Sequence, residues 1–270
     1  MRYVTLLITA VMLLGMATAA HPHGKETCGE AVSIEITAEH GRAFLTIPHR
    51  DNHKGGIHII KHYLEARRGE NYGIRIRNMT PERIGVVIAV DGRNIISGKR
   101  SDLTNDEAMY VINSYGYGCY DGWRTVGDTV HKFYFTDVAD SYAVRTFGDT
   151  TAMGVIAVAV YREKERPKPL YEHKWFKDTP RAPAAENQAR GTAKAFGDER
   201  AGTGFGDERY SPTIRVAFEP EKRPVQKTLF KYEWREVLCR KGILHCRREA
   251  RNRLWDEELY APYPPGYPRY

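Results

Sequence analysis

Two apolar runs joined by an Asp-Gly pair constrain the fold of this chain more than any other feature. Residues 83–100 read RIGVVIAVDGRNIISGKR, in which Ile84–Val90 is rich in β-branched side chains and residues 94–97 form the second run. Asp91 and Gly92 both tolerate the positive φ angles that a tight two-residue turn requires. The pattern predicts a β-hairpin in a buried core.

Several further segments have the period or the composition of strands. Apolar and polar residues alternate in residues 32–38 and 72–78, which predicts half-buried strands. The segment 57–66 is ambiguous, but its β-branched start favours a strand, and residues 48–56 (PHRDNHKGG) are predicted to be a loop. Further strands are expected at residues 43–47, 130–136, 141–146 and 152–161, the last buried on both faces. The fold class predicted is mostly β, an antiparallel β-sandwich.

Residues 1–20 have the composition of a secretory signal peptide. Arg2 is followed by an apolar run over residues 4–15 and then by four small residues. This run is shorter than the ~20 apolar residues that a transmembrane helix needs, and no later run is longer. We therefore expect a periplasmic or secreted protein without a transmembrane segment.

The chain has four cysteines, Cys28, Cys119, Cys239 and Cys246. In an exported protein an even count favours two disulfides, for which the sequence alone allows three pairings. We favour Cys239 with Cys246, which closes a short loop, and Cys28 with Cys119. The alternative is that they are buried free thiols. A zinc site is not favoured, because no Cys-x-x-Cys pair is present.

Basic residues exceed acidic ones, 41 against 34, for a formal net charge of +7. On an exported protein this excess favours anionic envelope polymers or acidic lipid surfaces as partners, and it does not favour nucleic acid. The alternative is that the charge serves solubility only, because both signs are interspersed through most of the chain.

The character of the chain changes at residue 162. We assign residues 21–163 to the sandwich domain, and residues 164–212, which are charged and rich in proline and alanine, to a linker or arm. The sequence FGDER occurs twice in the arm, at residues 196–200 and 205–209. Each copy is predicted to form a turn that inserts a phenylalanine into the sandwich.

The C-terminal part is predicted to be a partly ordered basic extension over residues 213–259. Strands are expected at residues 213–219 and 228–238, and a short helix at residues 247–259. In the second strand the aromatic residues share one face, so they should dock on the sandwich or complete its sheet; they are Phe230, Tyr232 and Trp234. Residues 260–270 form a tail rich in proline and tyrosine.

Histidine provides the main chemical hypothesis, because the sequence has no nucleophile elbow, zinc-protease, P-loop or dinucleotide motif. Seven of the ten histidines lie before residue 63. If signal cleavage follows Ala20, His21 becomes the amino terminus, which resembles the histidine brace of copper-dependent polysaccharide monooxygenases. That resemblance implies a bound copper ion. Cleavage before Ala20 would abolish the site.

His58 and His62 form a second possible metal site. A helix over residues 57–66 would bring both side chains together on one face, whereas a strand would keep them on one face but farther apart. The alternative is that both are ordinary histidines without a metal. We expect no cofactor, and copper is the alternative.

Aspartates offer another chemical alternative, because a pair of carboxyl groups could act as general acid and base in glycoside cleavage. The candidates lie near glycine, serine or strand ends: Asp121, Asp128, Asp137, Asp140 and Asp149. We prefer the interpretation that these side chains stabilise turns.

Residues 109–124, MYVINSYGYGCYDGWR, combine four tyrosines, three glycines, a tryptophan and a cysteine. We expect a large ordered loop whose side chains stack on sugar rings or anchor a protein partner. The candidate binding residues are Tyr115, Tyr117, Tyr120, Trp123 and Arg124. The alternative is that they fill the space between the loop and the sandwich.

Five segments resemble a set found in uncharacterised exported bacterial proteins. They are RIGVVIAVDGRNIISGK, GWR at Gly122–Arg124, FYFT at 133–136, SYAVRTFGD at 141–149 and GVIAVAVYRE at 154–163. The resemblance covers roughly residues 72–163 and implies a β-rich domain without a stated activity.

The residues together predict a non-enzymatic binding or structural protein of the bacterial envelope, with an envelope protein or a polysaccharide as partner. The alternative is a metal-dependent or carbohydrate-active secreted enzyme. A third possibility is a structural subunit whose arm and tail reach into a neighbour.

Overall fold

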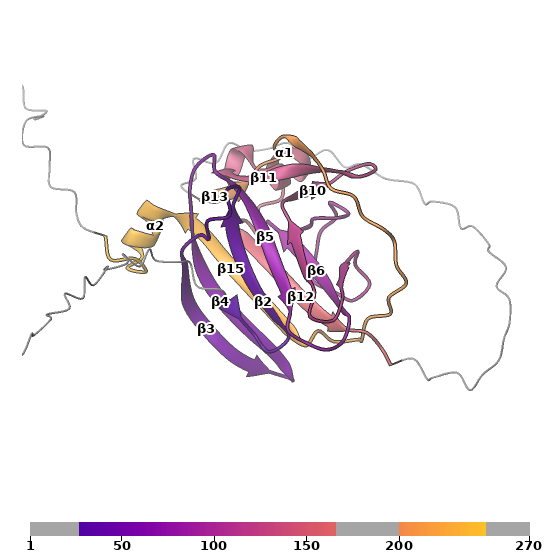
Figure 1. The fold of residues 1–270 in the computed structure, drawn as a ribbon. Coiled ribbons are helices and arrows are strands. Elements are labelled where there is room, and N and C mark those ends of the chain that lie inside the picture. Colours follow the sequence, from indigo (N-terminus) through magenta and orange to yellow (C-terminus); the bar gives the residue numbers. More distant parts are fainter. Residues whose placement is uncertain (1–26, 166–199, 247–270) are drawn as a thin grey trace, which may run out of the picture.

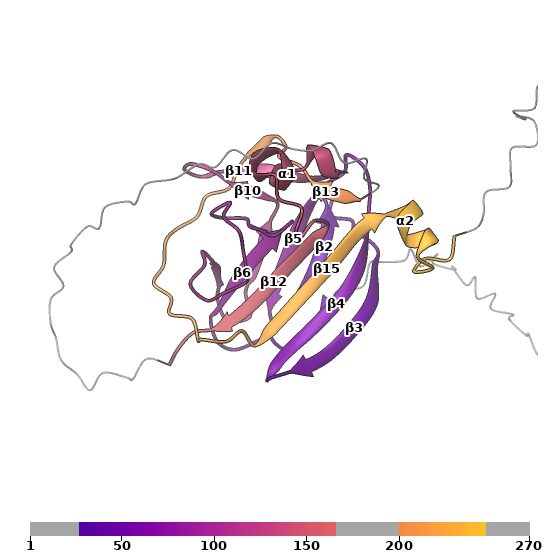
Figure 2. The ribbon, with the colours of Figure 1, turned by 180° about the vertical axis from the view of Figure 1, so that it is seen from behind.

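The computed structural model describes residues 27–165 and 200–246, which form two β-sheets packed face to face (Figures 1 and 2). The mostly β sandwich predicted from the alternating segments is confirmed. All but one of the strand pairs are antiparallel. The exception is β15 (Gln226–Trp234), which runs parallel to β4 (Ile57–Ala66).

The first sheet has eight strands, with the central order β1-β2-β5-β11-β10; β13 and β14 also pair with β11, and β9 pairs with β5. Its strands are β1 (Thr27–Cys28), β2 (Val32–Ala38), β5 (Asn71–Asn78), β9 (Tyr117–Tyr120), β10 (Gly122–Arg124), β11 (Thr129–Asp137), β13 (Ala201–Thr203) and β14 (Glu208–Tyr210).

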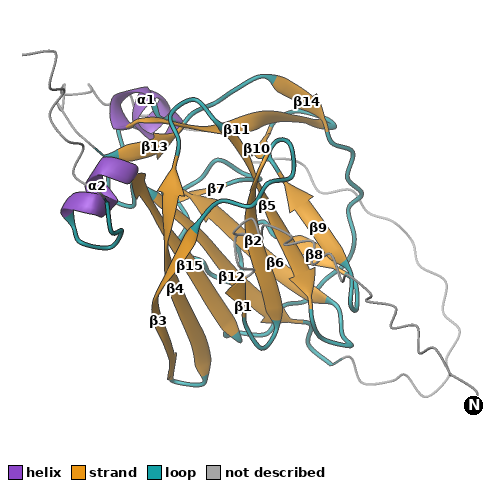
Figure 3. Cartoon of the chain, turned by 60° about the vertical axis from the view of Figure 1, so that its left-hand side comes forward, coloured by secondary structure: helices purple, strands orange, loops and turns teal. Residues whose placement is uncertain are grey.

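The second sheet has seven strands, with the order β3-β4-β15-β12-β6-β7 and β8 paired with β6. Besides β4 and β15 it contains β3 (Thr46–Lys54), β6 (Ile84–Val90), β7 (Arg93–Asn94), β8 (Tyr110–Ile112) and β12 (Val155–Arg162). The helices are a 3₁₀ turn, η1 (Val138–Asp140), and two α-helices, α1 (Tyr142–Phe147) and α2 (Arg235–Arg240). Figure 3 shows both α-helices at the upper end of the sandwich.

The predicted hairpin is present, with a shorter second strand than expected. Val90 pairs with Arg93 across the Asp91-Gly92 turn, and both turn residues have positive φ, 49° and 75°. These angles match the two-residue turn that the Asp-Gly pair predicts. The second strand, β7, ends at Asn94, because the Asn94 side-chain oxygen accepts from the backbone N–H groups of Ile96 and Ser97 and starts a turn.

Both faces of β6 and β12 are buried, as the near-continuous apolar sequence of these strands predicts. One face of β6 meets the first sheet. On the other face Val87 of β6 packs with Tyr161 of β12 beneath Leu103, from the connection that follows the hairpin. The Tyr161 hydroxyl donates a hydrogen bond of 2.6 Å to the Leu103 carbonyl, which holds that connection over the sheet.

The C-terminal segment completes the second sheet, which is one of the two arrangements expected for its aromatic strand. Strand β15 lies between β4 and β12, and its three aromatic residues, Phe230, Tyr232 and Trp234, are buried in the main core. The predicted boundary at residue 163 therefore cuts through the sandwich. The strand also ends earlier than predicted, at Trp234, where α2 begins.

A buried glutamine ties β15 to the opposite sheet. The Gln226 side-chain oxygen accepts from the backbone N–H groups of Ala31 and Val32, and its amide nitrogen donates to the Val32 carbonyl. Gly29 leaves room for this side chain, because a Cβ at residue 29 would lie 2.3 Å from the Gln226 amide nitrogen. The two sheets are thus joined by polar contacts as well as by the apolar core.

Four predictions of local structure are wrong. Residues 48–56, predicted as a loop, contribute most of β3, an edge strand whose bulge after Pro48 accommodates the proline. Residues 141–146, predicted as a strand, lie mostly in α1, because the Ser141 hydroxyl caps the N-terminus of this helix and Gly148 adopts the left-handed conformation at its C-terminus. Residues 109–124 form three short strands and not one large loop, and residues 213–219 contain no strand.

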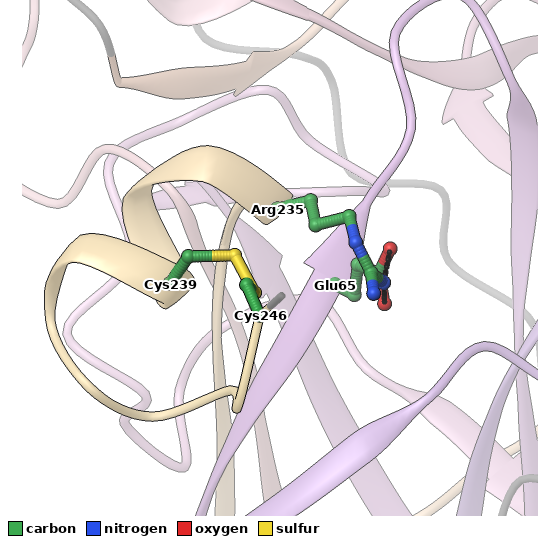
Figure 4. The surroundings of a disulfide bond; sticks show 4 residues. All are labelled: Glu65, Arg235, Cys239 and Cys246. Carbon is green, nitrogen blue, oxygen red and sulfur yellow. Dashed lines mark hydrogen bonds and ion pairs between the residues drawn. A yellow bond between two sulfur atoms is a disulfide. The ribbon is translucent and has the colours of Figure 1, made fainter. Parts of the chain in front are cut away.

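The disulfide between Cys239 and Cys246 is confirmed, and it closes the turn that follows α2 (Figure 4). Beside it Arg235, the first residue of α2, donates a hydrogen bond of 3.0 Å to Glu65 of β4. The ion pair holds the start of α2 against β4, and the disulfide fixes the turn after the helix.

The predicted pair of Cys28 and Cys119 is wrong, because both are exposed free thiols. Cys28 lies on β1 and Cys119 on β9, and strands β2 and β5 separate β1 from β9. Three strand spacings of ~4.8 Å place their Cα atoms roughly 14 Å apart or more, whereas a disulfide needs less than ~7 Å.

Several sequence predictions lie outside the described residues. These are the signal peptide, His21, most of the arm, the first FGDER copy, the helix at 247–259 and the C-terminal tail. Within the ranges that the structure describes, no helix is long and apolar enough to cross a membrane.

Candidate functional site

A polar groove lies on the outer face of the first sheet. It lies where β5 changes partner: β5 pairs with β11 at Asn71 and Tyr72, and with β9 from Ile74 to Arg77. Gly73 sits between these two pairings opposite Thr37. Because Gly73 has no side chain, the sheet surface is hollow at this point, and the groove has a volume of about 180 Å³.

The groove is lined by charged and amide side chains from several strands of the first sheet and their connections: Glu39, Asn71, Arg75, Asp121, Lys132 and Arg209. Lys132 pairs with Glu39, and Arg209 pairs with Asp121. These side chains end in carboxylate, amide, guanidinium or ammonium groups, which form hydrogen bonds. Contacts with neighbouring side chains hold them in place. The groove can therefore present several fixed polar groups to one small ligand.

Glu39 of the groove does not have the character of a general acid. Hydrogen bonds from Asn71 and then Lys132 lower the pKa of Glu39, so this group is ionised at neutral pH. The other carboxylate, Asp121, is ion-paired with the Arg209 guanidinium. A glycosidase needs one carboxyl group with a raised pKa to protonate the leaving oxygen. The groove is thus better suited to binding than to glycoside cleavage.

Exposed tyrosines extend the groove along β9. Tyr117 pairs with Arg77 and lies two residues from Cys119, which lines the groove, so both point to the outer face. The side chain of Tyr117 is 75% exposed and that of Tyr115, in the preceding turn, is 63% exposed. Together with Arg77, these side chains form an exposed rim, which we call the tyrosine rim.

Three of the five predicted binding residues serve the fold instead. Trp123 is 2% exposed, packs against Phe133 and Tyr142, and donates from Nε1 to the Gly204 carbonyl at 3.0 Å. Pairing of β10 with β11 turns this ring inward, so the expectation of a surface tryptophan is wrong.

The other two are held by contacts within the chain. Tyr120 packs on Tyr110 with ring centroids 4.4 Å apart, and burial raises its pKa. The Arg124 guanidinium donates to the Tyr110 hydroxyl and to the Ser211 carbonyl, both at 3.0 Å. Tyr115 and Tyr117 therefore remain as the exposed members of the predicted set.

The second FGDER copy does not insert its phenylalanine into the sandwich as predicted, because Phe205 is 39% exposed and lies on the surface. Phe205 stacks on His131, with centroids 4.0 Å apart, and on Tyr142 at 5.2 Å. In the same segment Arg209 supplies the cation of the groove that pairs with Asp121.

His58 and His62 do not form a common site. Both lie on β4, and four residues along a strand correspond to about 13 Å. His62 instead packs on Phe230, its partner in β15, and burial lowers its pKa although the nearby Asp51 charge opposes this. His58 meets a different histidine, His53, whose ring stacks on it at 4.3 Å.

Several of the predicted acidic candidates stabilise local structure. Asp149 accepts from the Thr151 backbone and hydroxyl, as the turn interpretation predicts, and also pairs with Arg93. Asp91, for which the sequence predicts only a turn, is a fully buried carboxylate. No periodic pattern distinguishes a turn aspartate that points inward.

A scan against protein-family models, a search of curated proteins and a search of solved structures each found no match to this chain.

Proposed function

We propose that this chain is an exported, non-catalytic binding protein of the bacterial envelope that holds a polysaccharide in the outer-face groove and on the tyrosine rim. The observation that carries the proposal is the continuity of the two features. Cys119 of the groove and Tyr117 of the rim are neighbours on one face of β9. A signal-like N-terminus supports export.

The size and chemistry of the groove support a sugar ligand. A volume of about 180 Å³ is smaller than the roughly 300 Å³ at the lower end of drug-sized sites, which suits one ring of a polymer and not a whole cofactor. Fixed carboxylate, amide and guanidinium groups match the many hydroxyl groups of a sugar. An exposed tyrosine then provides an apolar ring face for the next unit of the polymer.

The charge of this face favours an anionic polysaccharide. Along the groove and rim, Arg75 pairs with Glu35 at 3.1 Å. Arg77 is exposed and forms no ion pair with any of the described residues. An uncompensated guanidinium next to Tyr117 suits a carboxylate or phosphate on the polymer. The net charge of +7 acts in the same direction.

A binding titration with matched tyrosine variants tests the proposal. Tyr117 and Tyr210 are 75% and 74% exposed, but Tyr210 lies on β14 and does not line the groove. We expect Tyr117→Ala to weaken binding of soluble anionic envelope polysaccharides roughly tenfold or more, about 1.4 kcal/mol, and Tyr210→Ala to leave it unchanged.

Two results would count against the proposal. Equal loss in both tyrosine variants, or none in either, would place the ligand elsewhere. The chain could instead bind an envelope protein and no polysaccharide, with the same dependence on Tyr117. That result would support the tyrosine rim as the binding surface and reject a sugar as its ligand.

A further inference from the structure

Two histidines face each other at the tip of the β3–β4 hairpin, the lowest part of the coloured ribbon in Figures 1 and 2. His53 and His58 are direct cross-strand partners. Only four residues separate them, and the turn is formed by Gly55 and Gly56, with φ of 60° and 77°. Such a tight turn fixes the register, so the two imidazoles are held opposite each other by the backbone.

A carboxylate from the other sheet completes the group. Glu30 precedes β2, and its carboxylate lies 3.3 Å from His53 Nε2. One donor atom from each of Glu30, His53 and His58 lies within 4.8 Å of the others, and this is the only such group of three in the described part of the chain. The imidazole rings are stacked, 4.3 Å apart and 9° from parallel.

One ring nitrogen of His58 is without a hydrogen-bond partner in the part of the chain that the structure describes. Its side chain is 9% exposed, and its Nε2 lies 2.6 Å from an Asp51 carboxylate oxygen. This contact favours the tautomer with hydrogen on Nε2, which leaves a lone pair on Nδ1. Nδ1 is buried and has no hydrogen-bond partner among the described residues. A buried polar atom of this kind costs stability unless something binds it.

The same arrangement is the usual support of a metal-bound histidine, whose second ring nitrogen donates to a carboxylate that fixes the tautomer. We propose that Glu30, His53 and His58 bind one divalent transition-metal ion, Zn²⁺ or Cu²⁺, and that Asp51 orients His58. Two imidazoles and a carboxylate suit these ions, whereas Ca²⁺ and Mg²⁺ prefer oxygen donors. Three protein ligands leave one coordination position for water or a partner group.

This site is independent of the groove. Glu30 lies before the first residue of β2, whereas Thr37 and Ala38 at its far end line the groove, so roughly 20 Å of strand separates the two. It also differs from the two metal sites expected from sequence, because it needs neither His21 nor His62. Failure of one proposal leaves the other untouched.

Calorimetric titration of the untagged full chain with Zn²⁺ tests the site. We expect one ion per chain, weakened at least tenfold in His53→Ala and His58→Ala. Asp51→Asn should weaken binding roughly 10–100-fold, as loss of an orienting carboxylate does at known metal sites. His49→Ala is the matched control: His49 lies on the same strand and is exposed, but it is not part of the group, so binding should not change.

A second measurement uses Cu²⁺ and electron paramagnetic resonance, in which nitrogen ligands split the signal. Two imidazole nitrogens are expected in the unmodified protein and one in His53→Ala. His53 is 57% exposed, so this variant should fold even if His58→Ala does not. Unchanged affinity and stoichiometry in His53→Ala would show that the metal binds elsewhere, and absence of binding to the unmodified chain would reject the site altogether.

Discussion

The stability of the sandwich should depend on the charge of one buried carboxylate, Asp91. This side chain is fully buried at the hairpin turn. One carboxylate oxygen accepts from the Gly154 backbone at 2.7 Å and from the Tyr232 hydroxyl at 2.6 Å, and the other accepts from the Thr203 backbone at 2.8 Å. Burial raises the pKa of Asp91 from 3.8 to about 6, although these hydrogen bonds oppose the shift.

The direction of the pH effect follows from the two pKa values. Because the folded protein binds this proton more tightly than the unfolded chain, the contribution of Asp91 to stability is fully present below pH 3.8 and is lost as the pH rises through about 6. A difference of about 2 in pKa, at ~1.36 kcal/mol for each unit, corresponds to about 3 kcal/mol. Between pH 4 and pH 7 the charge of Asp91 should therefore destabilise the fold by about this amount.

The substitution Asp91→Asn isolates the effect of the Asp91 charge on stability, because asparagine does not titrate. Its amide nitrogen must face a backbone N–H of either Thr203 or Gly154, so one donor loses its acceptor at every pH, at a cost of about 1–3 kcal/mol. The variant should be less stable than the unmodified protein at pH 4. The difference in the free energy of unfolding between the unmodified protein and the variant, called the gap below, should narrow by about 3 kcal/mol by pH 7.

Urea unfolding followed by tryptophan fluorescence at several pH values between 4 and 7 measures the gap. Asp149→Asn is a control of opposite sign: burial raises the pKa of Asp149, but hydrogen bonds from Thr151 and the Arg93 charge outweigh it and lower the pKa. The stability contributed by Asp149 is lost as the pH falls, so its gap should widen toward neutral pH. A gap for Asp91→Asn that stays constant with pH would refute the reasoning.

Two further predictions concern packing and the thiols. Gly29→Ala should lower the free energy of unfolding, measured in urea, by about 1–3 kcal/mol, because the new Cβ would displace the Gln226 amide that joins the two sheets. A stability equal to that of the unmodified protein would show that Gln226 can move at no cost. Alkylation of the native protein should modify two thiols, Cys28 and Cys119, with two more after reduction, as read by intact mass; no modification before reduction would restore the two-disulfide hypothesis.

Strands with a one-sided apolar pattern were predictable from the sequence. In β5 the isoleucines are buried and the arginines exposed, as alternation predicts. Strand β3 was missed because most of its side chains are exposed, so no period marks it. It forms because the Gly-Gly turn returns the chain beside β4, which is a property of pairing and not of the strand itself.

The candidate site was predictable only in part, for a related reason. The tyrosines of residues 115–117 could be recognised as exposed candidates, but the same composition suggested Trp123, which the pairing of β10 with β11 buries. The groove itself depends on Gly73 and on the change of partner along β5. Likewise, His53 and His58 become neighbours only through the register of the β3–β4 hairpin. Because residues 48–56 were predicted to be a loop, the sequence could not indicate this pairing.

The position of β15 explains why composition misplaced the domain boundary. The amino-acid composition does change at residue 162. However, β12 pairs with β6 on one edge only and needs a second strand on the opposite edge, which residues 226–234 supply. A parallel partner for β4 cannot come from a short hairpin, so it must be supplied by a distant part of the chain. The core aromatics of β15 therefore belong to the sandwich as much as the central hairpin does, and Asp91 joins the two directly through the Tyr232 hydroxyl.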